Sequence, residues 1–115
     1  MTGSEDDPLF LALRPLRADY LADPPGKVAE LWRVLARVQN GERAAVRELR
    51  TLLHHLAGSG GAYGLPSVTE SARKAEQVID RCEPPGDRPS PADLAELRMH
   101  LTGVADAFDQ ARSTE

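Results

Sequence analysis

The chain has 115 residues, 41% of them hydrophobic, and a net charge of −4, which suits one folded domain with a single core. Its 18 Asp and Glu against 14 Lys and Arg residues argue against a general nucleic-acid binder. No apolar run is long enough to cross a bilayer, and the acidic N-terminus does not have the pattern of a signal peptide. We therefore expect a cytoplasmic protein with no membrane or nucleic-acid partner.

The N-terminal stretch is apolar but contains a proline. Because Pro15 interrupts a run of leucines, we expect residues 1–15 to be a partly flexible segment. A short helix over residues 16–21 is expected next, covering one end of the fold. Pro24, Pro25 and Gly26 then end this stretch.

Beyond residue 28, apolar residues repeat at the three- and four-residue spacing of amphipathic helices, without the alternation of strands. Asn40 and Gly41, Gly64 and Pro66, and residues 84–91 separate four such stripes. The stripes consist of Val28, Leu31, Trp32, Leu35 and Val38; of Val46, Leu49, Leu53 and Leu56; of Leu65, Val68, Ala72, Ala75, Ile79 and Cys82; and of Leu94, Leu97, Leu101, Val104 and Phe108.

Four amphipathic helices joined by short loops predict an all-α fold. We expect an antiparallel up-down four-helix bundle over residues 16–112, with the short extra N-terminal helix. Ser90 is placed to cap a helix that begins at Pro91, and Asp93 completes a pattern close to a capping box. Asn40 and Gly41 suit the left-handed conformation that ends a helix.

His54 lies opposite the apolar stripe of residues 46–61, so we expect its imidazole to face solvent. Arg47, Arg50, Gly58 and Gly61 share that face. Each exposed glycine costs a helix about 1 kcal/mol relative to alanine. One physical reason for glycines beside an exposed imidazole is that another macromolecule must come close to the ring.

Composition alone favours a different interpretation of the glycine run. Residues 58–61 read Gly-Ser-Gly-Gly, which is typical of a helix end that runs into a flexible loop. On that interpretation the helix would stop soon after His54.

The stretch LLHHLAGSGGAYGLPSVTESARKAE, residues 52–76, resembles the signature of histidine phosphotransfer (HPt) domains. In that family the phosphorylated histidine precedes an apolar residue two places on, a glycine four on and a small hydroxyl residue five on, then small residues, an aromatic and a turn glycine. The matching residues here are His54, Leu56, Gly58, Ser59, Tyr63 and Gly64. The resemblance extends more weakly over residues 16–110, and it implies that the helix continues through the glycines.

The resemblance implies a phosphocarrier and not a turnover enzyme. His54 would accept a phosphoryl group from a receiver-domain aspartate or a histidine kinase and pass it to a response regulator. The implied partners are a response regulator receiver domain and a sensor or hybrid histidine kinase. Magnesium would come with the receiver, so this chain is expected to bind no cofactor itself. A free imidazole is largely uncharged at neutral pH, so it can act as a nucleophile without a dedicated base.

One position departs from the family pattern. Many members have a lysine three residues after the histidine, where this chain has Ala57. Arg47, Arg50 or a protonated His55 are the candidates to replace that cation, and the sequence leaves the choice open. Arg47 and Arg50 could also steer the acidic surface of a receiver domain toward His54. The alternative interpretation, to which we give equal weight, is that they only form a solvated helix face.

Several alternatives accompany this interpretation. His55 is the competing phosphoacceptor, although the spacing to Gly58 and Ser59 favours His54 within the family pattern. Ser59, like Gly58 and Gly61, is a candidate for contact with the phosphoryl group or the receiver. Its hydroxyl could bond the imidazole or a backbone carbonyl one turn earlier, and the carbonyl is the default interpretation. The alternative function is a helical docking or scaffold module that binds receiver domains without phosphotransfer.

Other chemistry-bearing residues are expected to be structural. His100 flanks a core stripe and is interpreted as a half-buried packing residue. Cys82 is the only cysteine, so no internal disulfide can form. We expect no metal site, because adjacent histidines on a helix point about 100° apart and the spacing to the other candidates fits no known ligand pattern.

Overall fold

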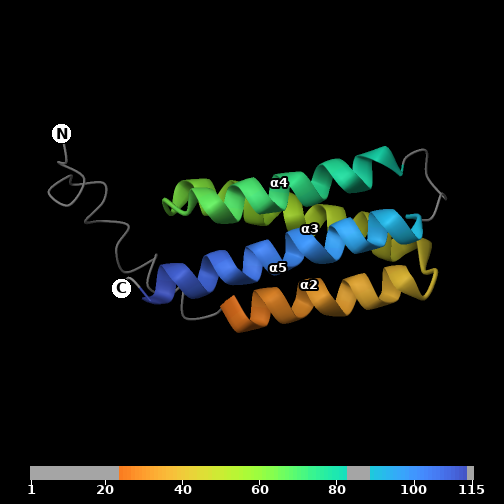
Figure 1. Ribbon diagram of the computed structural model, residues 1–115, viewed down its shortest axis with the longest axis horizontal. Coiled ribbons are helices and arrows are strands. Elements are labelled where there is room, and N and C mark those ends of the chain that lie inside the picture. The colour runs from red at the N-terminus through yellow and green to blue at the C-terminus, as the bar shows by residue number, and fades with distance from the viewer. Residues whose placement is uncertain (1–23, 83–88, 114–115) are drawn as a thin grey trace, which may run out of the picture.

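The structure is a computed structural model that describes residues 24–82 and 89–113. Its helices are α2 (Pro24–Gln39), α3 (Arg43–Ala62), α4 (Pro66–Arg81) and α5 (Pro91–Ser113), lying side by side along one axis (Figure 1). Helix α3 contacts α2 and α4, and α5 contacts α4 and α2. The predicted all-α antiparallel four-helix bundle is thus confirmed for the described part of the chain.

The expectations for the N-terminus fall outside this range. The partly flexible segment 1–15 and the short helix over residues 16–21 both lie outside the described residues.

Proline begins three of the helices: Pro24 in α2, Pro66 in α4 and Pro91 in α5. This position suits proline because its missing N–H is not needed in the first helical turn. At α5 the expected capping box forms. The Asp93 N–H donates to Ser90 Oγ at 3.0 Å, and the Ser90 N–H donates to Asp93 Oδ2 at 3.2 Å. This bond from the Ser90 backbone holds the pKa of the Asp93 carboxyl below its usual value.

Glycine shapes the two short turns. Gly41 lies between α2 and α3 with φ 88°, and Gly64 lies between α3 and α4 with φ 74°. Among the described residues no non-glycine residue has a positive φ, so the left-handed conformation expected at Asn40 and Gly41 is taken by the glycine alone.

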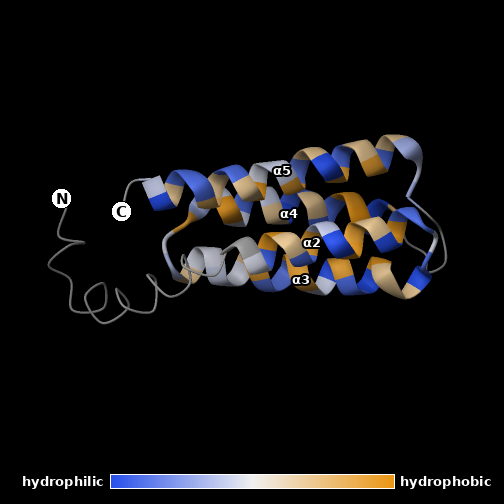
Figure 2. Cartoon of the chain, turned by 90° about the horizontal axis from the view of Figure 1, so that it is seen from below, coloured by the Kyte–Doolittle hydropathy of each residue, from blue (hydrophilic) through white to orange (hydrophobic). Residues whose placement is uncertain are grey.

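The predicted stripes meet along the bundle axis, as the hydropathy colouring of Figure 2 shows on the inward sides of the helices. All buried side chains among the described residues are apolar or Cys82. Val28, Trp32, Val46 and Leu94 are only partly buried and pack against the edge of the core. The largest fully buried side chains are Phe108, Leu31, Leu35, Leu49, Leu53, Ile79, Leu97 and Leu101.

Helix α3 continues through the glycine run to Ala62, so the loop favoured by composition is wrong. Gly60 is buried, and a Cβ atom on it would lie 2.7 Å from Thr69 Oγ1 and 3.1 Å from the Thr69 backbone nitrogen. The Thr69 hydroxyl also donates to the Ala57 carbonyl oxygen at 2.7 Å. Packing of α4 against this part of α3 therefore offsets the low helix propensity of glycine.

None of the four described helices combines the length and apolar character that a membrane-spanning segment needs.

We predict opposite effects of alanine at two glycines of α3. Gly60→Ala lowers the free energy of unfolding by about 1–3 kcal/mol, because the new methyl group collides with Thr69. Gly58→Ala raises it by up to about 1 kcal/mol, because a Cβ there meets nothing within 4 Å and alanine favours the helix. Urea denaturation of both variants measures this. Equal changes would show that α4 does not approach α3 at Gly60.

Candidate functional site

The centre of the site is the imidazole of His54, which stands on the outer wall of the bundle. Its side chain is 74% exposed, so the predicted exposure is confirmed. Leu53 and Leu56, its neighbours in α3, are buried and hold the helix against the core. The solvent-facing direction of His54 follows from the rotation of about 100° per residue that points these leucines inward.

A carboxylate from the next helix holds the ring. Glu76 of α4 places its Oε2 atom 3.3 Å from His54 Nδ1. Its side chain is only 13% exposed, whereas the imidazole projects into solvent. An ionised carboxylate can only accept hydrogen bonds, so the contact favours the tautomer with the proton on Nδ1. In that tautomer Nε2 keeps the lone pair.

The sequence analysis did not identify Glu76 as a partner of His54. The residue lies 22 positions after His54 on another helix. The signature of residues 52–76 ends on it, but no periodicity within one helix links the two side chains. Only the register between α3 and α4 brings them together.

A second cross-helix pair lies one turn along. Arg50 Nε of α3 donates to Asp80 Oδ1 of α4 at 2.7 Å. His54 follows Arg50 by four residues and Glu76 precedes Asp80 by four, as expected for antiparallel neighbouring helices. Of the predicted cations, Arg50 is thus already engaged on the surface of the bundle.

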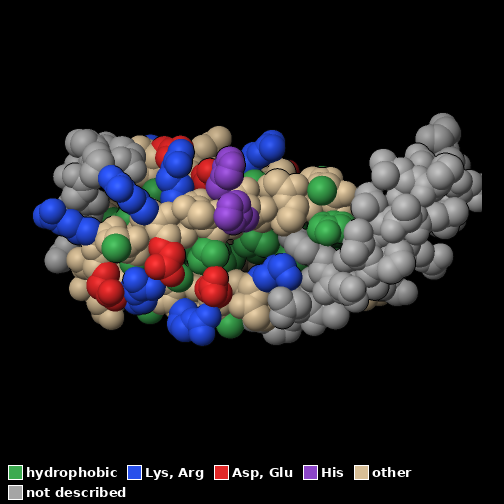
Figure 3. Space-filling view, turned by 180° about the vertical axis from the view of Figure 1, so that it is seen from behind, with side chains coloured by type: hydrophobic (Ala, Val, Ile, Leu, Met, Phe, Trp, Pro, Cys, Tyr) green, Lys and Arg blue, Asp and Glu red, His purple; other side chains and the backbone are tan. Residues whose placement is uncertain are grey.

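The remaining predicted polar residues line the same face of α3. His55 and Arg47 are exposed, and the two histidine rings lie with centroids 6.4 Å apart and planes tilted by 53°. Arg47 makes no ion pair with the residues that the structure describes. Figure 3 shows the two histidines together, with basic side chains on both sides of them.

The small residues after His54 differ in their surroundings. Gly58 is exposed, with open space where a Cβ would stand, and a Cβ on Gly61 would be in ordinary contact with Thr69. Ser59 Oγ donates to the Leu56 carbonyl oxygen at 3.4 Å, the structural use expected for it. Ala57, at the position where a lysine was expected from the family pattern, is 4% exposed. Gly58 is thus the residue of this group whose missing side chain is not explained by packing.

The other candidate residues take part in packing. Tyr63 packs against the core, and the His100 side chain is 14% exposed with Nε2 3.6 Å from Glu96 Oε2. Cys82 is buried and donates its thiol hydrogen bond to the Val78 carbonyl at 3.3 Å. Within residues 24–82 and 89–113, no group of three His, Cys, Asp or Glu side chains is arranged to hold a metal ion.

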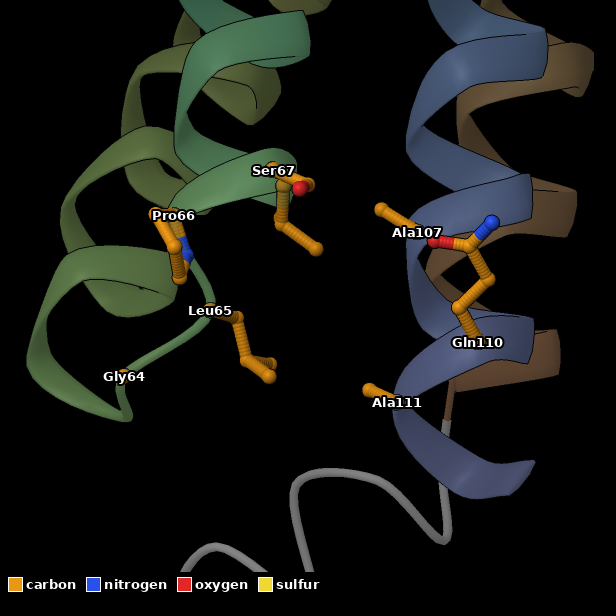
Figure 4. Close-up of a pocket in the computed structure, with 8 residues that line it drawn as sticks. Gly64, Leu65, Pro66, Ser67, Ala107, Gln110 and Ala111 are labelled. Carbon is orange, nitrogen blue, oxygen red and sulfur yellow. The ribbon is translucent and has the colours of Figure 1, made fainter. Parts of the chain in front are cut away.

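A shallow pocket of about 220 Å³ lies at the end of the bundle, between the turn from α3 to α4 and the last turns of α5 (Figure 4). Leu65, Ala107 and Ala111 supply apolar side chains, and Ser67 and Gln110 supply the polar ones. No histidine or charged side chain lines it, so it offers no acid or base to activate the Ser67 hydroxyl.

Comparison with known proteins gave one finding. A family model described as Hpt domain matches residues 16–113. No curated protein and no solved structure gave a match.

We predict that removal of the Glu76 carboxylate releases the His54 tautomer. In the intact chain we expect nitrogen NMR of the imidazole to show the proton mainly on Nδ1. In Glu76→Ala the ring returns toward the tautomer mixture of a free histidine, because the acceptor is lost. Glu70→Ala is the control, since Glu70 pairs with Lys74 on the same helix. An unchanged tautomer in Glu76→Ala would contradict the assignment.

Proposed function

Because this chain belongs to the Hpt domain family, we propose that it carries a phosphoryl group on Nε2 of His54 between two signalling partners. Members of this family are phosphotransfer modules of phosphorelays, and they are phosphocarriers and not turnover enzymes. They interact with the receiver and kinase domains of two-component systems. For this chain we propose that His54 accepts the group from a receiver-domain aspartate or a histidine kinase and passes it to a response regulator.

The exposure of the imidazole, combined with its bond to Glu76, carries the proposal. In the tautomer that this contact favours, the proton is on Nδ1 and the lone pair is on Nε2 of a ring that is 74% exposed. A histidine buried among the leucines would be out of reach of an aspartyl phosphate on another protein. His54 can be reached, and its orientation is fixed before a partner arrives.

The proposed step needs no proton transfer. The Nε2 lone pair attacks the phosphorus of the aspartyl phosphate, and the new N–P bond forms as the acyl O–P bond breaks. The bonding electrons return to the aspartate as its carboxylate. The imidazole then bears a positive charge, which faces the Glu76 carboxylate across the Nδ1–H bond. Onward transfer is the same step in reverse with a second receiver.

Positioning and charge neutralisation dominate phosphoryl transfer of this kind. We propose that the magnesium ion comes with the receiver partner and that this chain binds no cofactor of its own. The cytoplasmic location expected from the composition remains a prediction.

The central experiment mixes the chain with radiolabelled, phosphorylated receiver domains. We expect acid-labile label on the wild-type chain and on His55→Gln, and none on His54→Gln, because glutamine cannot form the phosphoramidate. Label that persists in His54→Gln and disappears in His55→Gln would move the acceptor to His55. A wild-type chain that binds receivers but takes no label would support the alternative function, a docking module without phosphotransfer.

The open space at Gly58 predicts a steric effect on docking. We expect Gly58→Leu to slow transfer from a receiver domain at least about tenfold, because its side chain would stand where the partner must approach. Labelling by phosphoramidate, a small donor, should be unchanged because it needs no protein interface. The control is Ala95→Leu at an exposed position of α5. Equal slowing with both donors would mean that the substitution disturbs His54 itself.

A further inference from the structure

The phosphoryl group on His54 needs a permanent cation, and the arginines of α3 are not placed to supply it. During in-line transfer the phosphoryl oxygens carry negative charge spread over all three, and a nearby cation stabilises it. Ala57 cannot supply one. Arg50 is four residues from His54, but Asp80 binds it at 2.7 Å. Arg47 lies two helical turns away, about 10 Å along the axis, and helical side chains lean toward the N-terminus, which here is away from His54.

Helix α4 presents one row of side chains to this part of α3. Thr69 contacts the backbone at Ala57 and the site of Gly60, Glu76 contacts His54, and Asp80 contacts Arg50. Residues 69, 73, 76 and 80 follow the spacing of four, three and four that keeps one helix face in line. Arg73 is the member of this row whose side chain forms no hydrogen bond or ion pair with the described residues of α3.

Arg73 has the properties that the missing cation needs. It is exposed and makes no ion pair with the described residues, whereas its neighbour Lys74 is bound to Glu70 at 3.0 Å. It precedes Glu76 by three residues and is therefore adjacent to the side chain that holds the His54 ring. Because α3 and α4 are antiparallel and Glu76 contacts His54, Arg73 is displaced from that contact toward the C-terminal end of α3. That is the side of Gly58, where a Cβ would meet nothing within 4 Å.

We propose that Arg73 is the phosphoryl-binding cation of this site, contacting the phosphoryl oxygens during transfer to and from His54. This inference rests on the proposed function. The guanidinium offers paired donors that match phosphoryl oxygens, and it reaches them from α4 and not from the helix that carries the histidine. The cation and the nucleophile would thus come from different helices, α4 and α3.

The test compares Arg73→Ala with Lys74→Ala, which removes the same charge from the next position of α4. Single-turnover transfer is measured against the concentration of a phosphorylated receiver that labels the wild-type chain. We expect Arg73→Ala to lower the saturating rate constant about tenfold or more, Arg73→Lys to recover part of the loss, and Lys74→Ala to leave the rate constant unchanged. Thermal unfolding checks that all three variants keep the fold.

The outcomes separate this inference from the proposed function. A wild-type chain that takes no label on His54 would refute the phosphocarrier proposal itself. A labelled wild-type chain with equal rate constants in Arg73→Ala and Lys74→Ala would refute only the role of Arg73. An effect of Arg73→Ala confined to receiver affinity, with an unchanged saturating rate constant, would also refute it, because a steering charge does not act on the phosphoryl group.

Discussion

The close packing of α3 on α4 is the constraint on which the site depends. Gly60 has no side chain, so α4 approaches until Thr69 lies against the α3 backbone and its hydroxyl binds the Ala57 carbonyl. This contact fixes how far one helix can slide along the other. With that register set, Glu76 faces His54 and Asp80 faces Arg50. A shift of one helical turn, about 5.4 Å, would place the imidazole beside a different residue of α4.

In this bundle different residues stabilise the fold and form the site. Among the described residues the interior is apolar and holds no charged side chain. Polar chemistry is therefore confined to the outer wall, where ionised groups keep most of their hydration. A rigid helix carries His54, and the ring needs only one partner from the neighbouring helix to fix its orientation. Such a surface offers a nucleophile without a cleft, which suits a substrate that is itself part of a folded protein.

Charge around His54 is unevenly distributed. The one carboxylate in contact with the ring binds it on the inner side, at Nδ1, while Arg50 is paired with Asp80. Arg47 and Arg73 stand exposed on different helices and make no ion pair within the described part of the chain. The arrangement leaves the outer side of the imidazole open to an anionic partner, because the carboxylate that contacts the ring is only 13% exposed and the ring is 74% exposed.

The sequence determined the helices, the buried stripes, the Ser90 cap and the exposure of His54, because each depends on residues within about one or two turns of one helix. Composition misjudged residues 58–61, since glycine's low helix propensity was outweighed by packing against Thr69, which is far along the chain. The pairing of His54 with Glu76 was likewise decided by the tertiary structure alone. It depends on the register of two antiparallel helices, and that register is set by side-chain packing that no periodicity within either helix encodes.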